Sequence, residues 1–331
     1  MDPIYVTGHR NPDTDSIVSA MAYAALQNAL GNREYVAARL GHISDETQLV
    51  LDRFGFESPV RIQTMRTQVR DLDYDTPPAL SRAVTISRAW NALQSDRSIP
   101  AIPVTNDDGT LYGMLSPSEI ADYDMQTIKN TYAENLPIFN LLNVLDGKVI
   151  NEAGYLVDRV SGEVSIALPQ QNENLLFSGK NSIVICGDQP EMARRAIEMN
   201  VNCLIVCQAE LPKELRELPT TTCIIATPFD AFKASRMIYH AIEAGRICRT
   251  EELDAFHLTD FVDDVKDVML ESRHRSYPIL DENDKVVGTI SRYHLLKPRR
   301  KRVVLVDHNE MSQSVPGLEQ ADILEIIDHH R

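Results

Sequence analysis

The sequence lacks several features that would assign it to a familiar class. Its 33 Lys and Arg stand against 48 Asp and Glu, for a net charge of −15, which argues against a nucleic-acid-binding protein because such a protein needs a basic face. No apolar run is long enough to span a membrane. The first residues, MDPIYVTGHR, have no basic start followed by an apolar stretch, so we expect no signal peptide. The five cysteines have no paired metal-type spacing and are expected to be buried, reduced thiols. Together these absences indicate a cytoplasmic protein that binds neither nucleic acid nor membrane.

What the sequence does contain is enough apolar material for sizeable cores. A length of 331 residues with 43% hydrophobic residues predicts two or three ordinary domains. The acidic balance does not exclude an anionic substrate, because bound cations can reverse the local field.

The two ends of the chain alternate strand and helix signals. Apolar or β-prone runs at 4–7 and 35–38 are each followed by a helix signal, the first helix capped by Ser16 and the second opened by Ser44. The second helix is predicted to place Leu49, Leu51 and Phe54 on its apolar side. Two further buried strands are predicted at 303–306 and 323–327. This alternation favours a parallel sheet covered on both faces.

Between these ends lie two similar segments, 102–116 and 277–291. Each reads as a strand, a polar turn, a second strand and a helix start, and ten positions separate the proline from the glycine in both. Such a repeat indicates two copies of one supersecondary unit that pack together. Another α/β region, about 128–248, separates the copies, with buried strands predicted at 182–186, 203–207 and 223–226. The chain is therefore predicted to be nested, with one parallel-sheet domain interrupted by a large insert.

Three clusters of metal-type ligands directly follow predicted strands. They are the segments 8–16, 307–310 and 328–330. In a parallel α/β sheet, ligands bind at the carboxyl ends of strands, so we expect the three clusters to meet. Carboxylates with imidazoles suit Mn²⁺, Co²⁺, Mg²⁺ or Zn²⁺, and two ions at one rim can bind the attacking and leaving oxygens of a phosphoryl displacement.

Each cluster also has a purely structural interpretation. Asp13 or Asp15 could cap the next helix, and Asp307 could form a turn. His329 and His330 could be exposed tail residues. The metal-site hypothesis depends on all three clusters occurring at strand ends.

These motifs resemble a known family. Asp328-His329-His330 is the signature of the DHH phosphoesterase superfamily, and His9-x-Asn11-Pro12-Asp13-Thr14-Asp15-Ser16 is similar to the form found in family II inorganic pyrophosphatases, whereas other members usually have glycine in place of Thr14. The segments Leu40-Gly41-x-Ile43-Ser44-x-Glu46-Thr47, Glu57-Ser58-Pro59 and Asp307-His308-Asn309-Glu310 resemble the same branch. The resemblance covers about the first 62 and the last 30 residues.

The resemblance implies a role for each motif residue. His9 and Asp13 would bind a first metal, Asp15 and His329 a second, and Asp307 would bridge both. His330 would contact the substrate near the phosphorus under attack, and Asp328 would orient the neighbouring histidines. The implied cofactors are two Mn²⁺ or Co²⁺ ions, with Mg²⁺ entering with the substrate, pyrophosphate.

The sequence departs from the family at its end. The family has a further Asp ligand downstream and a C-terminal domain whose Lys and Arg hold the substrate, and neither is present before Arg331. We therefore expect a truncated chain with an incomplete active site.

The insert resembles a pair of CBS domains that flank a DRTGG domain. The first part of the DHH domain is predicted at 1–65 and its second, truncated part at 301–331. Between them we expect a CBS domain at 66–127, a DRTGG domain at 128–248 and a second CBS domain at 249–300. In such pairs Ser116 and Ser291 would meet a phosphate or ribose, although both could simply cap helices. Tyr277 would stack on adenine or pack as a core strand residue, and Arg275 would pair with phosphate.

The resemblance of the insert implies regulation and assembly. AMP or ADP would inhibit, ATP or diadenosine polyphosphates would activate, and the insert would form a homodimer. The basic run 297–302 would be either a solvated linker or an element that couples insert to catalytic domain.

The sequence therefore predicts an α/β protein that hydrolyses pyrophosphate with divalent metals under adenine-nucleotide control. Two alternatives stay open: another DHH phosphoesterase acting on oligonucleotides or polyphosphate, and a non-catalytic nucleotide sensor.

Overall fold

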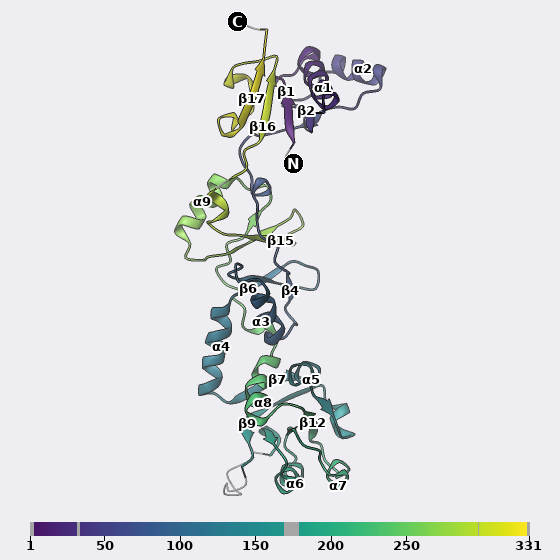
Figure 1. Ribbon diagram of the computed structural model, residues 1–331, viewed down its shortest axis with the longest axis vertical. Coiled ribbons are helices and arrows are strands. Elements are labelled where there is room, and N and C mark those ends of the chain that lie inside the picture. The colour runs from purple at the N-terminus through teal and green to yellow at the C-terminus, as the bar shows by residue number, and fades with distance from the viewer. Residues whose placement is uncertain (1–2, 32–33, 169–178, 297, 330–331) are drawn as a thin grey trace. The chain divides into compact units, whose positions relative to one another are not determined.

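The computed structural model of the chain describes residues 3–31, 34–168, 179–296 and 298–329 (Figure 1). The chain folds into two compact units. The first consists of Met1–Asp75, Asp254–Glu282 and Ile290–Arg331, and the second of Thr76–Leu253 and Asn283–Thr289. Within the described residues, we find no helix that is both long and apolar enough to cross a membrane.

A five-stranded sheet dominates the first unit. Its strand order is β17-β16-β1-β2-β3, and all neighbouring strands are parallel. The elements of this domain are β1 (Ile4–Thr7), α1 (Thr14–Ala29), β2 (Tyr35–Arg39), α2 (Asp45–Phe54), β3 (Val60–Arg61), β16 (Arg302–Val306) and β17 (Asp322–Ile327). The central pair joins the two ends of the chain, because Val6 is in register with Val304. The predicted nested parallel sheet is confirmed.

Apolar side chains from the central strands point to both faces of this sheet. On one face Val6 and Val304 pack with Ala20 and Ala24 of α1. On the other face a second cluster, which includes Ala38 and Leu305, is closed by Met65 and by Leu318 of the 3₁₀ turn η9 (Leu318–Gln320). The sheet edge at β17 is more open, with Ile326 51% exposed.

The two helices of this domain differ in detail from the sequence expectation. Asp13 caps α1, with its Oδ1 accepting a hydrogen bond from Ser16 N, so the helix begins three residues earlier than a Ser16 cap would require. Ser44 caps α2 as expected. Of the three apolar residues assigned to the buried side of α2, Leu51 is buried, whereas Leu49 and Phe54 are 70% and 67% exposed.

Both predicted repeats share the order strand, helix, strand, strand. In the second unit the first repeat contains β4 (Leu80–Ser81), α3 (Ile86–Ser95), β5 (Ile102–Thr105), β6 (Leu111–Leu115) and α4 (Pro117–Lys129). The second repeat contains β13 (Phe256–His257), α9 (Val262–Glu271), β14 (Tyr277–Leu280) and β15 (Val286–Ile290), and it ends in a 3₁₀ turn, η7 (His294–Leu296), where the sequence predicts a helix start. Within the second unit the two polar turns meet at an antiparallel bridge between Thr110 and Lys285.

The region between the repeats is a six-stranded α/β domain. Its strand order is β7-β9-β10-β11-β12-β8, with the four central strands parallel. Its elements are β7 (Tyr132–Pro137), α5 (Ile138–Leu145), β8 (Lys148–Val149), β9 (Arg159–Ile166), β10 (Ser182–Cys186), α6 (Pro190–Glu198), β11 (Cys203–Cys207), α7 (Lys213–Arg216), β12 (Cys223–Thr227) and α8 (Ala231–Met237). The central strands coincide with the continuous apolar runs in the sequence, as strands buried on both faces require.

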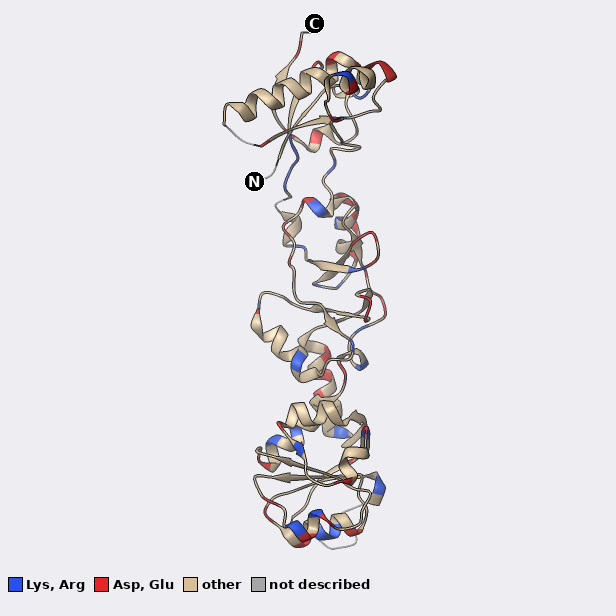
Figure 2. Ribbon diagram, turned by 90° about the vertical axis from the view of Figure 1, so that its right-hand side faces the viewer, with Lys and Arg blue, Asp and Glu red and all other residues tan. Residues whose placement is uncertain are grey.

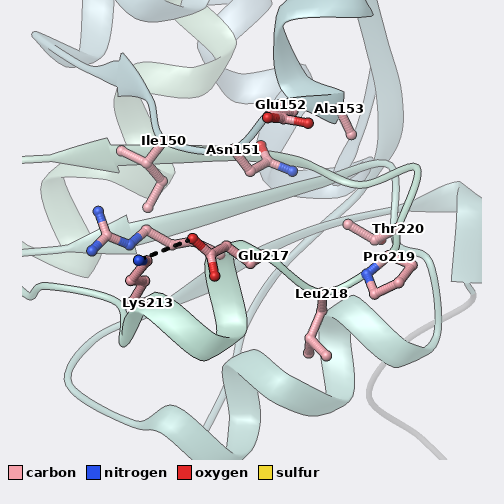
Figure 3. A pocket seen from close by; sticks show the side chains of 10 residues that line it. Ile150, Asn151, Glu152, Ala153, Lys213, Glu217, Leu218, Pro219 and Thr220 are labelled. Carbon is pink, nitrogen blue, oxygen red and sulfur yellow. Dashed lines mark ion pairs between the residues drawn. The ribbon is translucent and has the colours of Figure 1, made fainter.

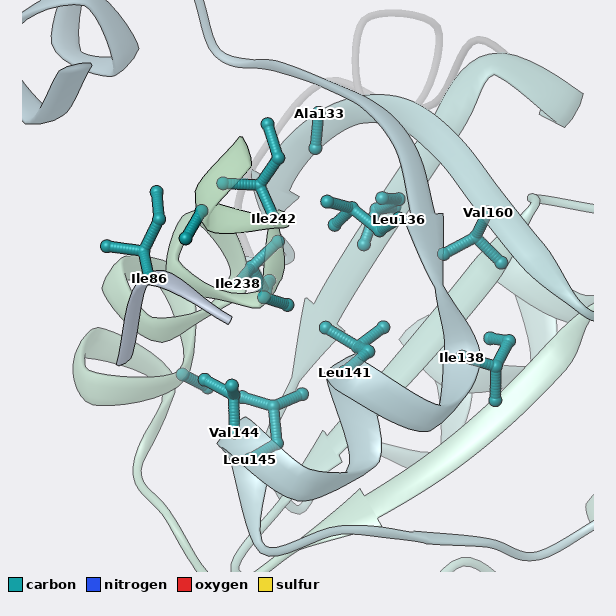
Figure 4. Close-up of a cluster of buried hydrophobic side chains, with 14 of the residues drawn as sticks. Ile86, Ala133, Leu136, Ile138, Leu141, Val144, Leu145, Val160, Ile238 and Ile242 are labelled. Atoms are coloured by element: carbon teal, nitrogen blue, oxygen red, sulfur yellow. The ribbon is translucent and has the colours of Figure 1, made fainter. Parts of the chain in front are cut away.

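One hydrophobic core runs through the first repeat and this α/β domain. Ile86 of α3 belongs to the same cluster as Leu141 of α5, Val160 of β9 and Ile238 (Figure 4). The predicted domain boundary at residue 127 therefore falls inside one compact unit. The division of the chain into five domain segments stays a prediction.

The five cysteines are all buried, unpaired thiols, as predicted. Burial raises the pKa of Cys186 to about 12 and that of Cys207 to about 11, so both thiols stay protonated at neutral pH.

We expect Leu141→Ala to destabilise the second unit by about 2–5 kcal/mol, because it leaves a cavity at a fully buried position of α5. Phe139→Ala on the same helix, where the ring is 76% exposed, is the matched control and should change stability little. Urea unfolding followed by circular dichroism would measure both variants. Equal losses would contradict the assignment of α5's buried face.

Candidate metal centre

The predicted metal ligands come together at the carboxyl edge of the five-stranded sheet. His9 and Asp13 lie in the loop after β1, Asp307 directly follows β16, and His329 lies two residues after β17. Because these strands are parallel, their carboxyl ends share one edge. The topology therefore brings together ligands from opposite ends of the chain.

The ligand atoms form two groups that share one carboxylate. The first group is His9, Asp13 and Asp307, and the second is Asp15, Asp307 and His329, with the ligand atoms of each group within 4.8 Å of one another. The Nε2 atom of His9 lies 3.5 Å from Asp307 Oδ2, and the Nδ1 atom of His329 lies 3.7 Å from Asp307 Oδ1. The grouping is the same as the one that the family resemblance implies.

Asp307 is the central residue of this arrangement. It is 7% exposed, and its backbone has a φ of 58°, a left-handed conformation that aspartate tolerates better than most residues. Its amide donates to the carbonyl of Ile327, which fixes the end of β16 against the end of β17. Its Oδ2 atom faces the imidazole of His9, and its Oδ1 atom faces the imidazole of His329.

His308 was not among the predicted site residues, yet it is completely buried beside the centre. Its Nδ1 is 3.2 Å from the carbonyl of Val306, and its Nε2 has no hydrogen-bond partner among the described residues. Burial is the main cause that lowers the pKa of His308, and the nearby His9 lowers it further. A neutral His308 whose Nδ1–H donates to Val306 fits this environment. The feature of the sequence that could have identified His308 is its position directly after Asp307.

The two ligand groups line a pocket of about 610 Å³. Its lining residues are His9, Arg10, Asn11, Asp13, Asp15, Asp307, Glu310, Ser312, Gln313 and His329. Arg10 and Gln313 were not among the predicted site residues. Arg10 lies inside the first motif, and its amide donates to the carbonyl of Gln313, so the first motif and the segment after Asp307 are joined directly.

Small and hydroxyl residues hold the first motif loop in place. A Cβ atom on Gly8 would lie 1.7 Å from Ser16 Oγ, the same hydroxyl that accepts a hydrogen bond from the His9 amide. A Cβ on Gly41 would lie 2.1 Å from the carbonyl oxygen of Arg10. Close backbone packing at these two glycines therefore sets the position of the loop that carries His9 and Asp13.

The segment 40–47 also supports the loop that carries His9 and Asp13, through hydrogen bonds between hydroxyl groups. Thr14 Oγ1 is 2.9 Å from Thr47 Oγ1, and the buried Thr47 is also bonded to Ser44, the cap of α2. The hydroxyl of Thr14 thus ties the first loop to the start of α2, a contact that glycine at this position could not make.

The remaining predicted site residues have the following surroundings. Asp328 lies after β17 and is half-buried, and His330 lies outside the described residues. In the second unit Ser116 caps α4 through a reciprocal capping box with Glu119. In the first unit Ser291 Oγ is 3.0 Å from His294 Nδ1, and Arg275 is exposed.

Tyr277 is a buried strand residue in the structure. It is 0% exposed, its ring is 5.6 Å from that of Phe256, and its hydroxyl donates to the carbonyl of His274. This environment fits the core alternative, so adenine stacking by Tyr277 would require the ring to become exposed.

A larger hollow of about 660 Å³ lies away from these ligands, in the α/β domain of the second unit (Figure 3). Its charged lining residues are Lys213, Arg216, Glu152 and Glu217, and Lys213 lies 3.6 Å from Glu217. These charges balance, and no group of metal-type ligands was found there among the described residues. The smaller pocket at the sheet edge is therefore the better candidate for chemistry.

Comparison with known proteins agrees with the fold. A family profile for the DHH family, N-terminal domain, matches residues 3–331. The cobalt-dependent inorganic pyrophosphatase of Clostridium perfringens (strain 13 / Type A) is 40% identical over 337 aligned positions, covering 100% of this chain and 61% of that protein. The probable manganese-dependent inorganic pyrophosphatase of Thermotoga maritima is 30% identical over 338 positions, with the same coverage. The chain thus spans about 61% of the length of these relatives.

A solved structure matches the insert. It contains the CBS and DRTGG domains of the regulatory region of Clostridium perfringens pyrophosphatase, complexed with its activator diadenosine tetraphosphate. The TM-score is 0.58 at 32% sequence identity, over 68% of this chain and 99% of that chain.

The nested parallel sheet and its ligand-bearing edge, together with the profile match, define the class: the chain belongs to the DHH family. Within that family, it is similar to the two inorganic pyrophosphatases named above, and its insert is similar to a CBS and DRTGG regulatory region.

We expect Asp307→Asn to weaken binding of Mn²⁺ or Co²⁺ to both ligand groups, because the two groups share this carboxylate. The loss should be at least the 10–100-fold typical of a supporting residue, since Asp307 would be a direct ligand. Calorimetric titration of the full chain would measure it, with the exposed Asp52→Asn as the control for loss of one carboxylate. Loss of one group alone would contradict a shared ligand.

Gly41→Ala should displace the first motif loop, because the new methyl group would overlap the carbonyl of Arg10. We expect a stability loss of about 1–3 kcal/mol together with weaker Co²⁺ binding. Gly187→Ala is the matched control, since no atom lies within 4 Å of its added Cβ. Thermal unfolding and Co²⁺ titration of both variants would test this, and unchanged Co²⁺ binding in Gly41→Ala would refute the supporting role.

Proposed function

We propose that the protein to which this chain belongs hydrolyses inorganic pyrophosphate with two divalent cations. The observation that carries the proposal is the pair of ligand groups that share Asp307 at the carboxyl edge of the sheet. Two imidazoles and three carboxylates are donors that suit Mn²⁺ and Co²⁺, which agrees with the cobalt and manganese dependence of the two similar pyrophosphatases.

The ligand residues divide their tasks by position. Asp307, which is buried and held by the Ile327 carbonyl, would present one oxygen to each metal. His9 and Asp13 would complete the first site, and Asp15 and His329 the second. When bound, two such cations supply Lewis-acid polarisation of phosphoryl oxygens and an acidified water.

Other residues of the same edge would bind and orient the substrate. Arg10 lines the pocket and is exposed, so its guanidinium is available to a phosphoryl oxygen. His330 would contact the substrate near the phosphorus under attack, and Asp328 would orient the adjacent imidazoles. Mg²⁺ would accompany pyrophosphate as its counter-ion.

We further infer that adenine nucleotides regulate this activity through the two repeats. The support is the similarity to a regulatory region solved with diadenosine tetraphosphate as activator. Arg275 and Ser291 in the first unit and Ser116 in the second are the proposed contacts, with Tyr277 a contact only if its ring becomes exposed. AMP or ADP would inhibit, and ATP or a diadenosine polyphosphate would activate.

Assembly and location complete the proposal. Exposed apolar residues of the second unit, such as Met125, Ile128 and Phe232, offer a surface for a homodimer. Five unpaired thiols favour a cytoplasmic location.

The test is phosphate release from pyrophosphate by this chain with Mn²⁺ or Co²⁺, with and without AMP. We expect Asp307→Asn to abolish any metal-dependent release, because it removes the ligand shared by both sites. Asp52→Asn should leave release unchanged.

Two other outcomes would favour the alternatives. Hydrolysis of a dinucleotide without hydrolysis of pyrophosphate would identify another DHH phosphoesterase. AMP binding with no metal-dependent release, both here and after the chain is extended by the C-terminal part of a relative, would instead identify a nucleotide sensor.

A further inference from the structure

A small pocket lies at the amino edge of the five-stranded sheet, opposite to the metal centre. It has a volume of about 140 Å³ and is lined by the start of β1, by the 3₁₀ turn η1 (Val69–Asp71) and by the basic run that leads into β16. All of its residues belong to the first unit. Figure 2 shows this basic run as the blue stretch that enters the sheet beside the N-terminus.

The charge of this pocket is opposite to that of the chain. Its charged lining residues are Arg70, Arg299, Arg300, Lys301, Arg302 and Asp71. Five cations therefore face one carboxylate, although the whole chain has a net charge of −15. Such a local reversal is what binding of an anion requires.

Ion pairs hold part of this basic run in a fixed position. Lys301 Nζ donates to Asp71 Oδ2 at 2.6 Å and to the carbonyl of Arg66 at 2.8 Å, and its side chain is only 14% exposed. Arg302 lies 3.6 Å from Asp322, and Arg299 is paired with Asp73. The wall of the pocket is thus built before any ligand arrives.

Two cationic side chains of the pocket take no part in these ion pairs. Arg70 and Arg300 are exposed, and neither forms an ion pair with any residue that the structure describes. The phenol of Tyr5 lies between these elements, where burial and then Asp71 raise its pKa, while Arg70 lowers it. A protonated phenol and two guanidinium groups are therefore available as donors.

We propose that this pocket is a binding site for an inorganic phosphate-type anion, held chiefly by Arg70 and Arg300. Guanidinium groups match phosphate oxygens bidentately, and a volume of about 140 Å³ corresponds to a few water molecules, which suits a small anion better than a nucleotide. Among the described residues that line the site there is no group of metal-type ligands, and the site does not depend on the proposed hydrolysis.

The test uses the full chain in excess chelator, so that the metal centre cannot bind phosphate. The ³¹P line width of inorganic phosphate would be titrated against protein at constant ionic strength, set with chloride. We expect saturable broadening, and at least a tenfold weaker affinity in the double variant Arg70→Gln/Arg300→Gln. Both side chains are exposed, so the variant should retain the wild-type unfolding midpoint.

Three single variants serve as controls. Arg216→Gln removes one exposed cation from the second unit, Arg275→Gln removes the proposed nucleotide contact, and Asp307→Asn removes the metal ligand. All three should bind phosphate within about twofold of the unaltered chain. The proposal fails if no saturable broadening occurs, if Arg216→Gln weakens binding as much as the double variant, or if Arg275→Gln alone abolishes it. None of these results would bear on pyrophosphate hydrolysis, which is measured with metal present.

Discussion

The parallel pairing of β1 with β16 is the interaction on which the rest of the molecule depends. It joins the first and last parts of the sequence, so that Val6 is in register with Val304. Only because of this pairing do His9 and Asp307 lie 3.5 Å apart between Nε2 and Oδ2. The insert must therefore leave and return to the sheet without separating these two strands. A nested chain solves this by placing the whole insert between β3 and β16, outside the pairing.

Asp307, at the end of β16, is the residue that both groups of metal-type ligands share. A buried carboxylate is costly unless it is hydrogen-bonded or near cations, and Asp307 is 7% exposed with an imidazole beside each oxygen. Its left-handed backbone and its amide bond to Ile327 hold it in this position. Much of the remaining site is a frame around that carboxylate: Gly8 and Gly41 allow close backbone contact, and the hydrogen bond between Thr14 and Thr47 holds the loop. Such a rigid frame is what two closely spaced cations need.

The sequence predicted the elements that depend on local pattern and missed those that depend on contact. Strands such as β10 and β11 are continuous apolar runs, and they were predicted with their observed bounds. Leu49 and Phe54 were assigned to a buried face because they are apolar, but burial on α2 is decided by what packs against the helix, and nothing in the pattern shows this. The same holds for Arg10 and Gln313, whose contact joins segments far apart in the sequence. The ligand grouping could be anticipated because strand ends converge by topology alone.

Strand β16 is one of the strands that run from the amino edge of the sheet to its carboxyl edge. Arg302 begins β16 at the basic pocket, and Asp307 follows its last residue at the metal centre. Five residues of strand span about 16 Å, and β16 is hydrogen-bonded to β1 on one side and to β17 on the other. Arg299 and Arg300 precede this strand and follow the second repeat. An anion that draws these residues toward Arg70 would act on the same strand that carries Asp307. The basic run that follows the second repeat therefore leads directly into the strand whose other end precedes Asp307.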